Sequence, residues 1–235
     1  MPWYWILIIL SAIIGPFEAM HALNKARRNR EEAEKRRQEA DRPVKEDTKK
    51  DEELTVNGKT YRILRLLGHG KGGYSYLAEA DGKQAVLKQI HHEPCDYYTF
   101  GNKIEAEKRD YERLKEAGIR IPQMLDIDEE TERIVKEFID GETVLDLVCD
   151  GRSTEPYLDQ VREMAEQARK AGLNIDYFPT NFVIRDGLIW YVDYECNEYM
   201  EKWDFEHWGI RYWSRTPEFL EYLAEKQNPQ DKELD

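Results

Sequence analysis

Two aspartates and an asparagine in the C-terminal third of the chain have the types and spacing for metal-dependent phosphoryl transfer. Asp176 lies five positions before Asn181, and Asp193 follows the apolar residues 188–192. An Asp-Gly pair at 186–187 separates two apolar runs and predicts a β-hairpin that brings Asp193 back towards the other two side chains. One carboxylate could then orient an attacking hydroxyl, while an Asn and an Asp hold Mg²⁺ on the phosphates. The alternative is that these residues only form turns and cap a strand.

A glycine-rich segment followed by a lysine-bearing strand is the second candidate for this chemistry. Gly68, Gly70 and Gly73 form a G-x-G-x-x-G pattern between predicted strands at 61–67 and 74–80. A dinucleotide-binding fold would require a helix directly after the glycines, whereas here a strand follows. A turn at Asp81-Gly82 then leads into a third strand, 83–90, that carries Lys88.

The order and spacing of these features resemble the protein-kinase superfamily over about residues 56–209. The resemblance implies that Asp176 is the catalytic Asp, that Asn181 and Asp193 hold Mg²⁺, and that Lys88 reaches the ATP phosphates under a cover formed by the glycines. The chain looks most like small atypical kinases: the RIO group, the tRNA-modification-complex kinase and bacterial lipopolysaccharide-sugar kinases. These share a shortened C-terminal lobe, and the brevity of the lobes suggests a bacterial source.

A helix predicted over residues 99–117 must supply the glutamate that pairs with Lys88 if the resemblance holds. Glu105, Glu107 and Glu112 compete for this role. The E…L…AG pattern of small atypical kinases favours Glu107. Without that resemblance, any one of them is more often a solvated surface charge.

Residues 137–141, with the sequence EFIDG, resemble the segment that links the two lobes of a kinase. Backbone groups of this segment bind adenine in the family, which implies contacts from Glu137 and Ile139. Lys136 stands where a hydrophobic residue is common, and the sequence offers no physical reason for it.

Three further positions depart from the family pattern. Ser75 replaces the usual Val that packs on adenine, with Tyr74 or Tyr76 as possible substitutes. Asn174 replaces a His that braces the catalytic loop, a structural role whose loss need not abolish activity. Glu195 replaces the Gly that lets the metal-binding segment swing, so we do not expect switching by that movement. Glu195 could also add a carboxylate to the metal site.

The N-terminal residues have the pattern of a membrane anchor. Residues 2–17 carry no charged side chain and span roughly 24 Å as a helix, and extension to Leu23 approaches the ~30 Å of a hydrocarbon core. The positive charges follow this run, whereas a cleavable signal peptide carries them before it. We expect a single-pass anchor over 1–23 in the cell membrane, with the rest of the chain in the cytoplasm.

Composition sets the remaining limits. The net charge of −13 does not favour a nucleic-acid partner, and three widely spaced cysteines fit neither a disulfide framework nor a zinc ribbon. Residues 24–53 are rich in charged side chains and predict a solvated helical linker, residues 54–228 form the predicted kinase-like domain, and 229–235 a disordered tail. Further strands are expected at 121–127 and 133–139, and helices at 143–148, 155–171 and 216–227.

Together these observations predict an α+β, bilobal kinase-like fold with a shortened C-terminal lobe behind one transmembrane helix. The predicted function is transfer of the ATP γ-phosphate to a hydroxyl acceptor, foremost a protein Ser/Thr, with ATP and Mg²⁺ as cofactors. A pseudokinase scaffold that binds nucleotide or partners is the alternative from another class. A sugar or lipid-linked small molecule is the alternative acceptor.

Overall fold

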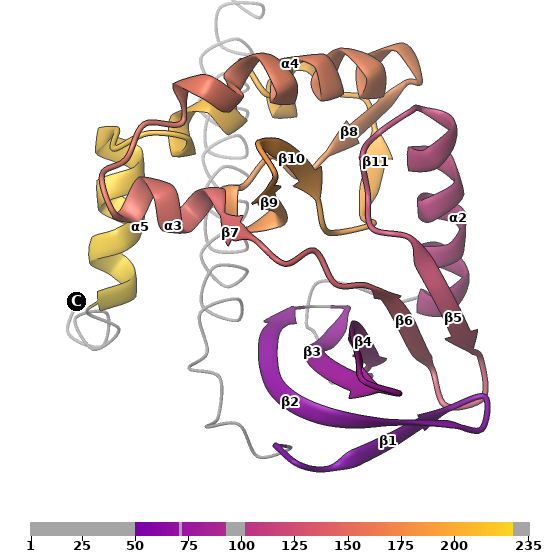
Figure 1. The fold of residues 1–235 in the computed structure, drawn as a ribbon. Coiled ribbons are helices and arrows are strands. Elements are labelled where there is room, and N and C mark those ends of the chain that lie inside the picture. The colour runs from indigo at the N-terminus through magenta and orange to yellow at the C-terminus, as the bar shows by residue number, and fades with distance from the viewer. Residues whose placement is uncertain (1–49, 71, 93–101, 228–235) are drawn as a thin grey trace, which may run out of the picture. The chain divides into compact units, whose positions relative to one another are not determined.

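The computed structural model describes residues 50–70, 72–92 and 102–227. In this part of the chain the first strands form a six-stranded antiparallel sheet with the order β1-β2-β3-β4-β6-β5 (Figure 1). The strands are β1 (Glu53–Val56), β2 (Lys59–Gly70), β3 (Gly73–Ala80), β4 (Lys83–Ile90), β5 (Met124–Asp128) and β6 (Arg133–Glu137).

Tight turns set the register of the first strands. The predicted turn at Asp81-Gly82 is confirmed: both residues have positive φ, 53° and 71°, and Ala80 pairs with Lys83. Positive φ at both central residues is what a two-residue hairpin of this twist requires, and Asp and Gly tolerate it. Asn57, in the β1–β2 turn, donates from Nδ2 to Asp126 Oδ1 of β5 at 2.8 Å. The sheet therefore curls until its two edges approach each other.

One face of this sheet buries an apolar cluster, and the opposite face carries Lys88 together with the buried Ile90 and Ile134. Strand residues alternate between faces, so Leu87 enters the cluster while its neighbour Lys88 points the other way. The fully buried members of the cluster are Val56, Ile63, Ala78, Leu87 and Val135.

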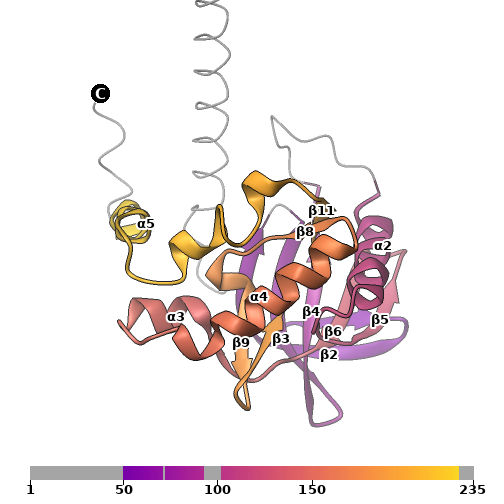
Figure 2. The same ribbon diagram turned by 90° about the horizontal axis from the view of Figure 1, so that it is seen from above.

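Helix α2 (Lys103–Glu116) lies beside the sheet, next to β5 in Figures 1 and 2. Asn102 caps its first turn by accepting a hydrogen bond from the Glu105 N–H, and Gly118, with φ of 79°, follows its end. Buried Ile104 packs with Ile90 and Ile134 and so fixes the helix against the strands. The predicted helix began at residue 99, but 99–101 lie outside the described residues.

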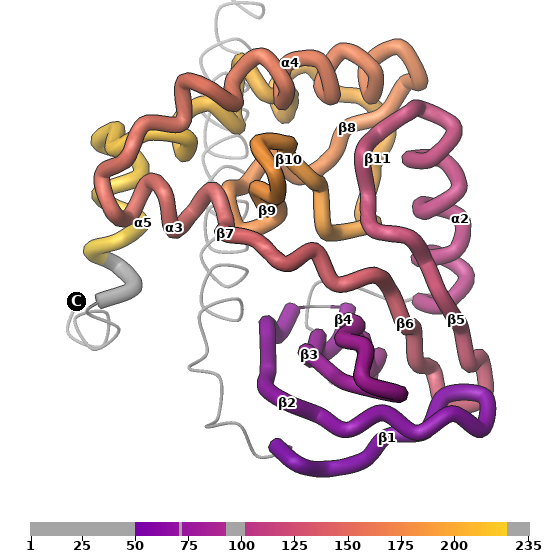
Figure 3. The backbone as a smooth tube through the Cα atoms, in the orientation of Figure 1, coloured from indigo at the N-terminus to yellow at the C-terminus, as the bar shows by residue number. Residues whose placement is uncertain are grey.

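The chain enters its C-terminal part through residues 138–141, which connect β6 to β7, as the tube in Figure 3 shows. There β7, β9 and β10 form a three-stranded sheet and β8 pairs with β11. The elements are β7 (Glu142–Thr143), α3 (Val144–Cys149), α4 (Glu155–Lys170), β8 (Leu173–Ile175), β9 (Phe182–Arg185), β10 (Leu188–Tyr191), β11 (Cys196–Glu198) and α5 (Pro217–Gln227), with 3-10 turns η1 (Pro179–Asn181), η2 (Glu201–Trp203) and η3 (Gly209–Tyr212).

Aromatic side chains from the last third of the chain fill the core of this C-terminal part. Phe205 and Trp213 are buried, and the Trp213 indole N–H donates to the Tyr177 carbonyl at 2.8 Å. These two aromatic residues therefore pack in the core. Trp203 differs, since it remains 48% exposed.

The mixed α+β class is confirmed, and the curled sheet is consistent with a kinase-like fold. Within residues 50–70, 72–92 and 102–227, no helix is both long and apolar enough to cross a membrane. The predicted anchor at 1–23, nearly all of the predicted linker and the tail at 229–235 lie outside the described residues.

Candidate active site

The predicted hairpin forms and places two candidate metal ligands side by side along the backbone. Strands β9 and β10 pair around Asp186 and Gly187, whose φ values are 53° and 75°. Beyond the paired strands, the Val192 N–H donates to the Asn181 carbonyl at 2.9 Å. Asp193 therefore follows directly after a residue that is hydrogen-bonded to Asn181.

The loop from Asp176 to Asn181 is closed by its own hydrogen bonds. Asp176 Oδ1 accepts from the Phe178 N–H at 3.0 Å, and Asn181 Nδ2 donates to the Asp176 carbonyl at 3.3 Å. Because the amide nitrogen of Asn181 is used inside the loop, its oxygen is the end that can face a cation. Thr180 Oγ1 lies 3.5 Å from that oxygen.

A tyrosine that sequence reasoning missed ties this loop to the segment after Asp193. The Tyr191 hydroxyl accepts from the Asp176 N–H at 3.3 Å and donates to the Glu195 carbonyl at 2.8 Å. Burial raises the pKa of Tyr191 well above its usual value, so the hydroxyl stays a donor. The only hint in the sequence is a phenol at the buried end of an apolar strand.

Asn174 stands where the family has a His that braces the catalytic loop, but it holds another segment of the chain. It is buried, accepts from the Met200 N–H at 2.8 Å and donates to the Met200 carbonyl at 3.4 Å. Asn174 thus holds the chain after β11, and Tyr191 provides the link to the metal-binding segment.

Lys88, Glu107 and Asp193 converge from three separate elements. The Lys88 ammonium forms an ion pair with Glu107 Oε1, and it lies 3.9 Å from Asp193 Oδ1. The Lys88 and Glu107 side chains are only 11% and 14% exposed, whereas Asp193 is 32% exposed. Burial alone would lower the pKa of Lys88, but the two carboxylates outweigh it and raise that pKa.

A second buried lysine lies at the same cluster. Lys136 pairs with Val86 on β4, two residues from Lys88, so both lysines stand on the same face of the sheet. Its ammonium donates to the Val192 carbonyl at 2.6 Å and lies 4.7 Å from the centre of the Tyr194 ring. Burial lowers the pKa of Lys136 and the Lys88 charge lowers it further, while nearby carboxylates oppose both.

The two aspartates of the site have opposite pKa shifts. Partial withdrawal of the Asp176 carboxylate from solvent, with the negative charges of Glu195 and Asp193 nearby, raises its pKa to about 6. Burial acts in the same direction on Asp193, but there the ammonium groups of Lys88 and Lys136 prevail and lower the pKa. At neutral pH Asp193 is a fixed anion, and Asp176 can exchange a proton.

The three glycines of the G-x-G-x-x-G segment differ in how much space surrounds them. Strand pairing continues to Gly70 and Gly73, so the two strands extend beyond the predicted 61–67 and 74–80 and the segment forms the tip of their hairpin. A Cβ on Gly73 would lie 2.3 Å from the Gln89 carbonyl oxygen, so packing demands glycine there. A Cβ on Gly68 or Gly70 would meet nothing within 4 Å, and neither has positive φ. The fold itself therefore leaves open space at these two positions, where a ligand could approach the backbone.

The prediction that Tyr74 or Tyr76 takes the place of the missing Val is wrong. Ser75 pairs directly with Lys88 and shares its face, which puts Tyr74 and Tyr76 on the opposite face of β3. Tyr76 is buried in the apolar cluster of the sheet. Neither tyrosine can therefore take the place of a side chain beside Lys88.

The linking segment keeps backbone groups available, as an adenine site needs. The Glu137 N–H donates to the Gln123 carbonyl, and its side chain pairs with Arg185 at 3.0 Å. Among the backbone hydrogen bonds of the described residues, none uses the N–H or carbonyl of Ile139. Gly141 is required by packing, since a Cβ there would lie 2.1 Å from the Ile184 carbonyl oxygen.

The donors at this site suit Mg²⁺ held jointly by protein and phosphates. Asn181 and Asp193 offer only oxygen ligands, and Glu195 adds a nearby carboxylate whose Oε1 accepts from Asn197 at 3.4 Å. Within the part of the chain that the structure describes, no group of three or more His, Cys, Asp or Glu residues could hold a metal ion. A cation here would therefore depend on nucleotide oxygens as well.

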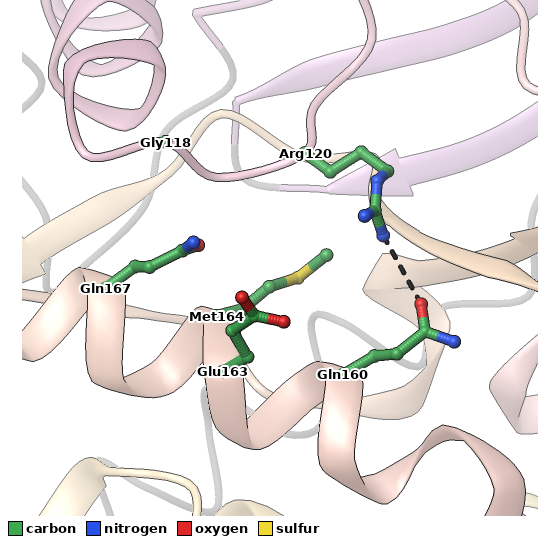
Figure 4. A pocket seen from close by; sticks show the side chains of 6 residues that line it. All are labelled: Gly118, Arg120, Gln160, Glu163, Met164 and Gln167. Carbon is green, nitrogen blue, oxygen red and sulfur yellow. Dashed lines mark hydrogen bonds between the residues drawn. The ribbon is translucent and has the colours of Figure 1, made fainter.

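A small pocket elsewhere contains none of these residues. Figure 4 shows it between the end of α2 and helix α4, where Arg120 Nη1 donates to Gln160 Oε1 at 3.3 Å. Its lining residues are Gly118, Arg120, Gln160, Glu163, Met164 and Gln167.

Comparison with known proteins supports the kinase-like reading at a coarse level. No profile of a known protein family matches the chain. A curated protein similar to it is the KEOPS complex subunit Bud32 of Pyrococcus abyssi (strain GE5 / Orsay), 25% identical over 151 residues. The match covers 58% of this chain and 68% of that protein. It supports a place in the protein-kinase-like superfamily.

Proposed function

We propose that the chain is an ATP-dependent phosphotransferase that moves the γ-phosphate to a hydroxyl acceptor. The observation that carries the proposal is the convergence of Lys88, Glu107 and Asp193, from β4, α2 and the end of β10, at one largely buried cluster. Such a cluster has a strong reason to exist if its lysine binds phosphates, because buried ion pairs by themselves contribute little net stability.

Each residue has a distinct role in the proposed reaction. Lys88, held by Glu107, binds the phosphates of ATP, and the glycine-rich hairpin covers them. Asn181 and Asp193 would hold Mg²⁺, which supplies charge neutralisation at the phosphates when it is bound. Asp176 accepts the acceptor's hydroxyl proton while that oxygen bonds to the γ-phosphorus. The bond from this phosphorus to the bridging oxygen breaks, and ADP leaves.

The adenine would lie against the linking segment. The unused N–H and carbonyl of Ile139 support this position, with Glu137 as the second expected backbone contact. Since Ser75 leaves room beside Lys88, a bulky apolar side chain does not cover the base from that strand.

The acceptor we propose first is a protein Ser or Thr hydroxyl, presented near a membrane. The uncharged residues 2–17, followed by a basic segment, support an anchor in the cell membrane with the kinase-like domain in the cytoplasm. Membrane fractionation of the full chain, beside a variant lacking residues 1–23, tests the anchor. We expect that only the full chain stays with membranes after a carbonate wash.

A scaffold without catalysis is the second candidate. It is favoured by Glu195 at a position where the family has Gly, and by the name of the similar protein, which is a subunit of a complex. A scaffold of this kind would bind nucleotide or partners but would not turn ATP over.

Phosphate transfer from γ-labelled ATP distinguishes the two candidates. The full-length chain is incubated with Mg²⁺ and with protein, sugar or lipid acceptors in separate reactions, beside Asp176→Asn and Lys88→Met. We expect labelled acceptor or ADP formation by the unaltered chain and a loss of at least about 10²-fold in each variant. ATP binding with no turnover in any reaction would favour the scaffold, and absence of ATP binding would refute the phosphotransferase.

A further inference from the structure

Lys136 gives the candidate site a charge balance that the expected set of site residues does not predict. The cluster contains two carboxylates, that of largely buried Glu107 and that of half-buried Asp193. Lys88 alone would leave one of these two negative charges uncompensated. Lys136, only 6% exposed, adds a second ammonium. Lys88 and Lys136 then face Glu107 and Asp193 before any metal or nucleotide arrives, and Glu195 is a further carboxylate that acts on Lys88.

Several neighbours of the Lys136 amine stabilise its charged form, against the burial and the Lys88 charge that lower its pKa. It donates to the Val192 carbonyl at 2.6 Å and lies over the face of the Tyr194 ring at 4.7 Å, and both are groups that stabilise a cation. Asp193 follows Val192 directly, and Asp193 and Glu107 both interact favourably with the ammonium. The repulsive neighbour is Lys88, which Glu107 holds in an ion pair.

The position of Lys136 also makes its charge available to a ligand. Lys136 and Lys88 stand on the same face of the sheet, and Asp193 beside them is 32% exposed, so the cluster reaches solvent on the side of the aspartate. An ATP triphosphate with Mg²⁺ absent carries about four negative charges, and a site with one net negative charge would repel it. A second ammonium group in the cluster weakens this repulsion.

We propose that Lys136 supplies a built-in positive charge beside Asp193, so that the site binds the ATP triphosphate with reduced dependence on Mg²⁺. The inference rests on the proposed function, since it assumes that this cluster is the phosphate site. It makes Lys136 a specificity-determining residue for the form of nucleotide bound. It also explains why a buried lysine stands where an apolar side chain would pack at lower cost.

The test measures ATP binding by the full-length chain in the presence of EDTA and in the presence of Mg²⁺, with a non-hydrolysable analogue as ligand. Lys136→Gln removes the charge but keeps a donor for the Val192 carbonyl, and Lys136→Arg keeps the charge. We expect the ratio of metal-bound to metal-free affinity to rise on the order of tenfold in Lys136→Gln, the size expected for one unit charge that acts over about 12 Å at an effective dielectric constant of about 20. In Lys136→Arg it should stay within about twofold of the unaltered chain.

Lys103→Gln is the matched control, because Lys103 is equally buried and its amine also donates to a backbone carbonyl, that of His91. The ratio of metal-bound to metal-free affinity should not change in Lys103→Gln. Thermal unfolding of each variant confirms folding, and Lys136→Met replaces Lys136→Gln if the latter does not fold.

Two outcomes would overturn the inference. An unchanged ratio in a folded, uncharged Lys136 variant would show that the charge does not act on the nucleotide, and an equal rise in Lys136→Arg would show that shape and not charge is responsible. If the unaltered chain binds the analogue under neither condition, the proposed function itself fails and this inference fails with it.

Discussion

At the scale of single residues, the chemistry depends on the ionisation of Asp176. A carboxylate can accept a proton from an alcohol only when it is ionised, and the pKa of Asp176 is raised to about 6. We therefore predict that the rate of phosphate transfer rises between about pH 5 and pH 7 with a midpoint near 6, measured as initial rates at saturating ATP. A flat profile over this range would exclude Asp176 as the titrating base.

The Asp176→Asn variant tests the same residue without loss of the fold. Because the folded-state pKa of Asp176 lies above the usual value near 3.9, its ionisation destabilises the folded protein as the pH rises from about 4 to about 6. At pH 7 the Asn variant should accordingly have a Tm equal to or above that of the unaltered chain. Loss of transfer, by about 10² to 10⁴-fold, would then report chemistry and not unfolding.

At the scale of elements, the Tyr191 hydroxyl joins the catalytic loop to the segment that carries Asp193. Tyr191→Phe leaves the Asp176 N–H and the Glu195 carbonyl without this partner, which costs about 1–3 kcal/mol. We predict a Tm lower by about 2–10 °C and a rate of phosphate transfer lower by about 10- to 100-fold, since small displacements of a catalytic group slow the reaction strongly.

Tyr194→Phe is the control for this prediction. Its hydroxyl also makes one buried hydrogen bond, to the Pro122 carbonyl at 2.9 Å, but it does not touch the catalytic loop. A similar loss of Tm with a smaller loss of rate is expected. If both variants lose rate equally, the link through Tyr191 has no special part in positioning Asp176.

Substitution by alanine should affect stability at one glycine and ATP binding at another. A Cβ at position 141 would lie 2.1 Å from the Ile184 carbonyl oxygen, so Gly141→Ala must displace the linking segment from β9 and should cost about 1–3 kcal/mol in the free energy of unfolding. A Cβ at position 68 meets nothing within 4 Å. Gly68→Ala should leave the Tm unchanged and weaken ATP binding several-fold, because the methyl group enters the space proposed for phosphates.

Chemical denaturation and calorimetric titration measure these two quantities. The interpretation of Gly68 as a ligand-facing residue would be wrong if Gly68→Ala bound ATP as tightly as the unaltered chain. Unchanged stability of Gly141→Ala would mean that the link between the two parts adjusts more easily than its close packing indicates.

At the scale of the whole molecule, a ligand held by both parts of the domain should stabilise all of it. A ligand at 100 times its Kd adds about 2.7 kcal/mol to the free energy of unfolding, which corresponds to a rise in Tm of roughly 5–10 °C for a domain of this size. We predict this rise for ATP with Mg²⁺, measured by scanning calorimetry of the full chain. Asp193→Ala should reduce the contribution of Mg²⁺ to the rise, and a rise caused by Mg²⁺ alone would point to a different metal site.

The local elements and the order of the polar residues along the chain could be predicted from residue types and spacing. The turns at Asp81-Gly82 and Asp186-Gly187 were predictable because few residue pairs accept positive φ at both positions. The strand that carries Lys88 and the hairpin before Asp193 followed from those turns and from apolar runs. Residues 1–49 lie outside the described residues, so the anchor remains a prediction from the sequence.

Which side chains meet depends on the packing of elements that lie far apart in the chain. The tertiary structure placed Lys88 against Glu107 and not against Glu105 or Glu112, because that choice depends on the rotation of α2 about its axis, which the packing of Ile104 and Leu114 sets. It turned Tyr74 and Tyr76 away from Lys88 through the register of β3 against β4. Contacts between residues more than fifty positions apart, such as that of Lys136 with Val192, leave no local pattern in a sequence, because only the packing of β6 against the segment after β10 creates them.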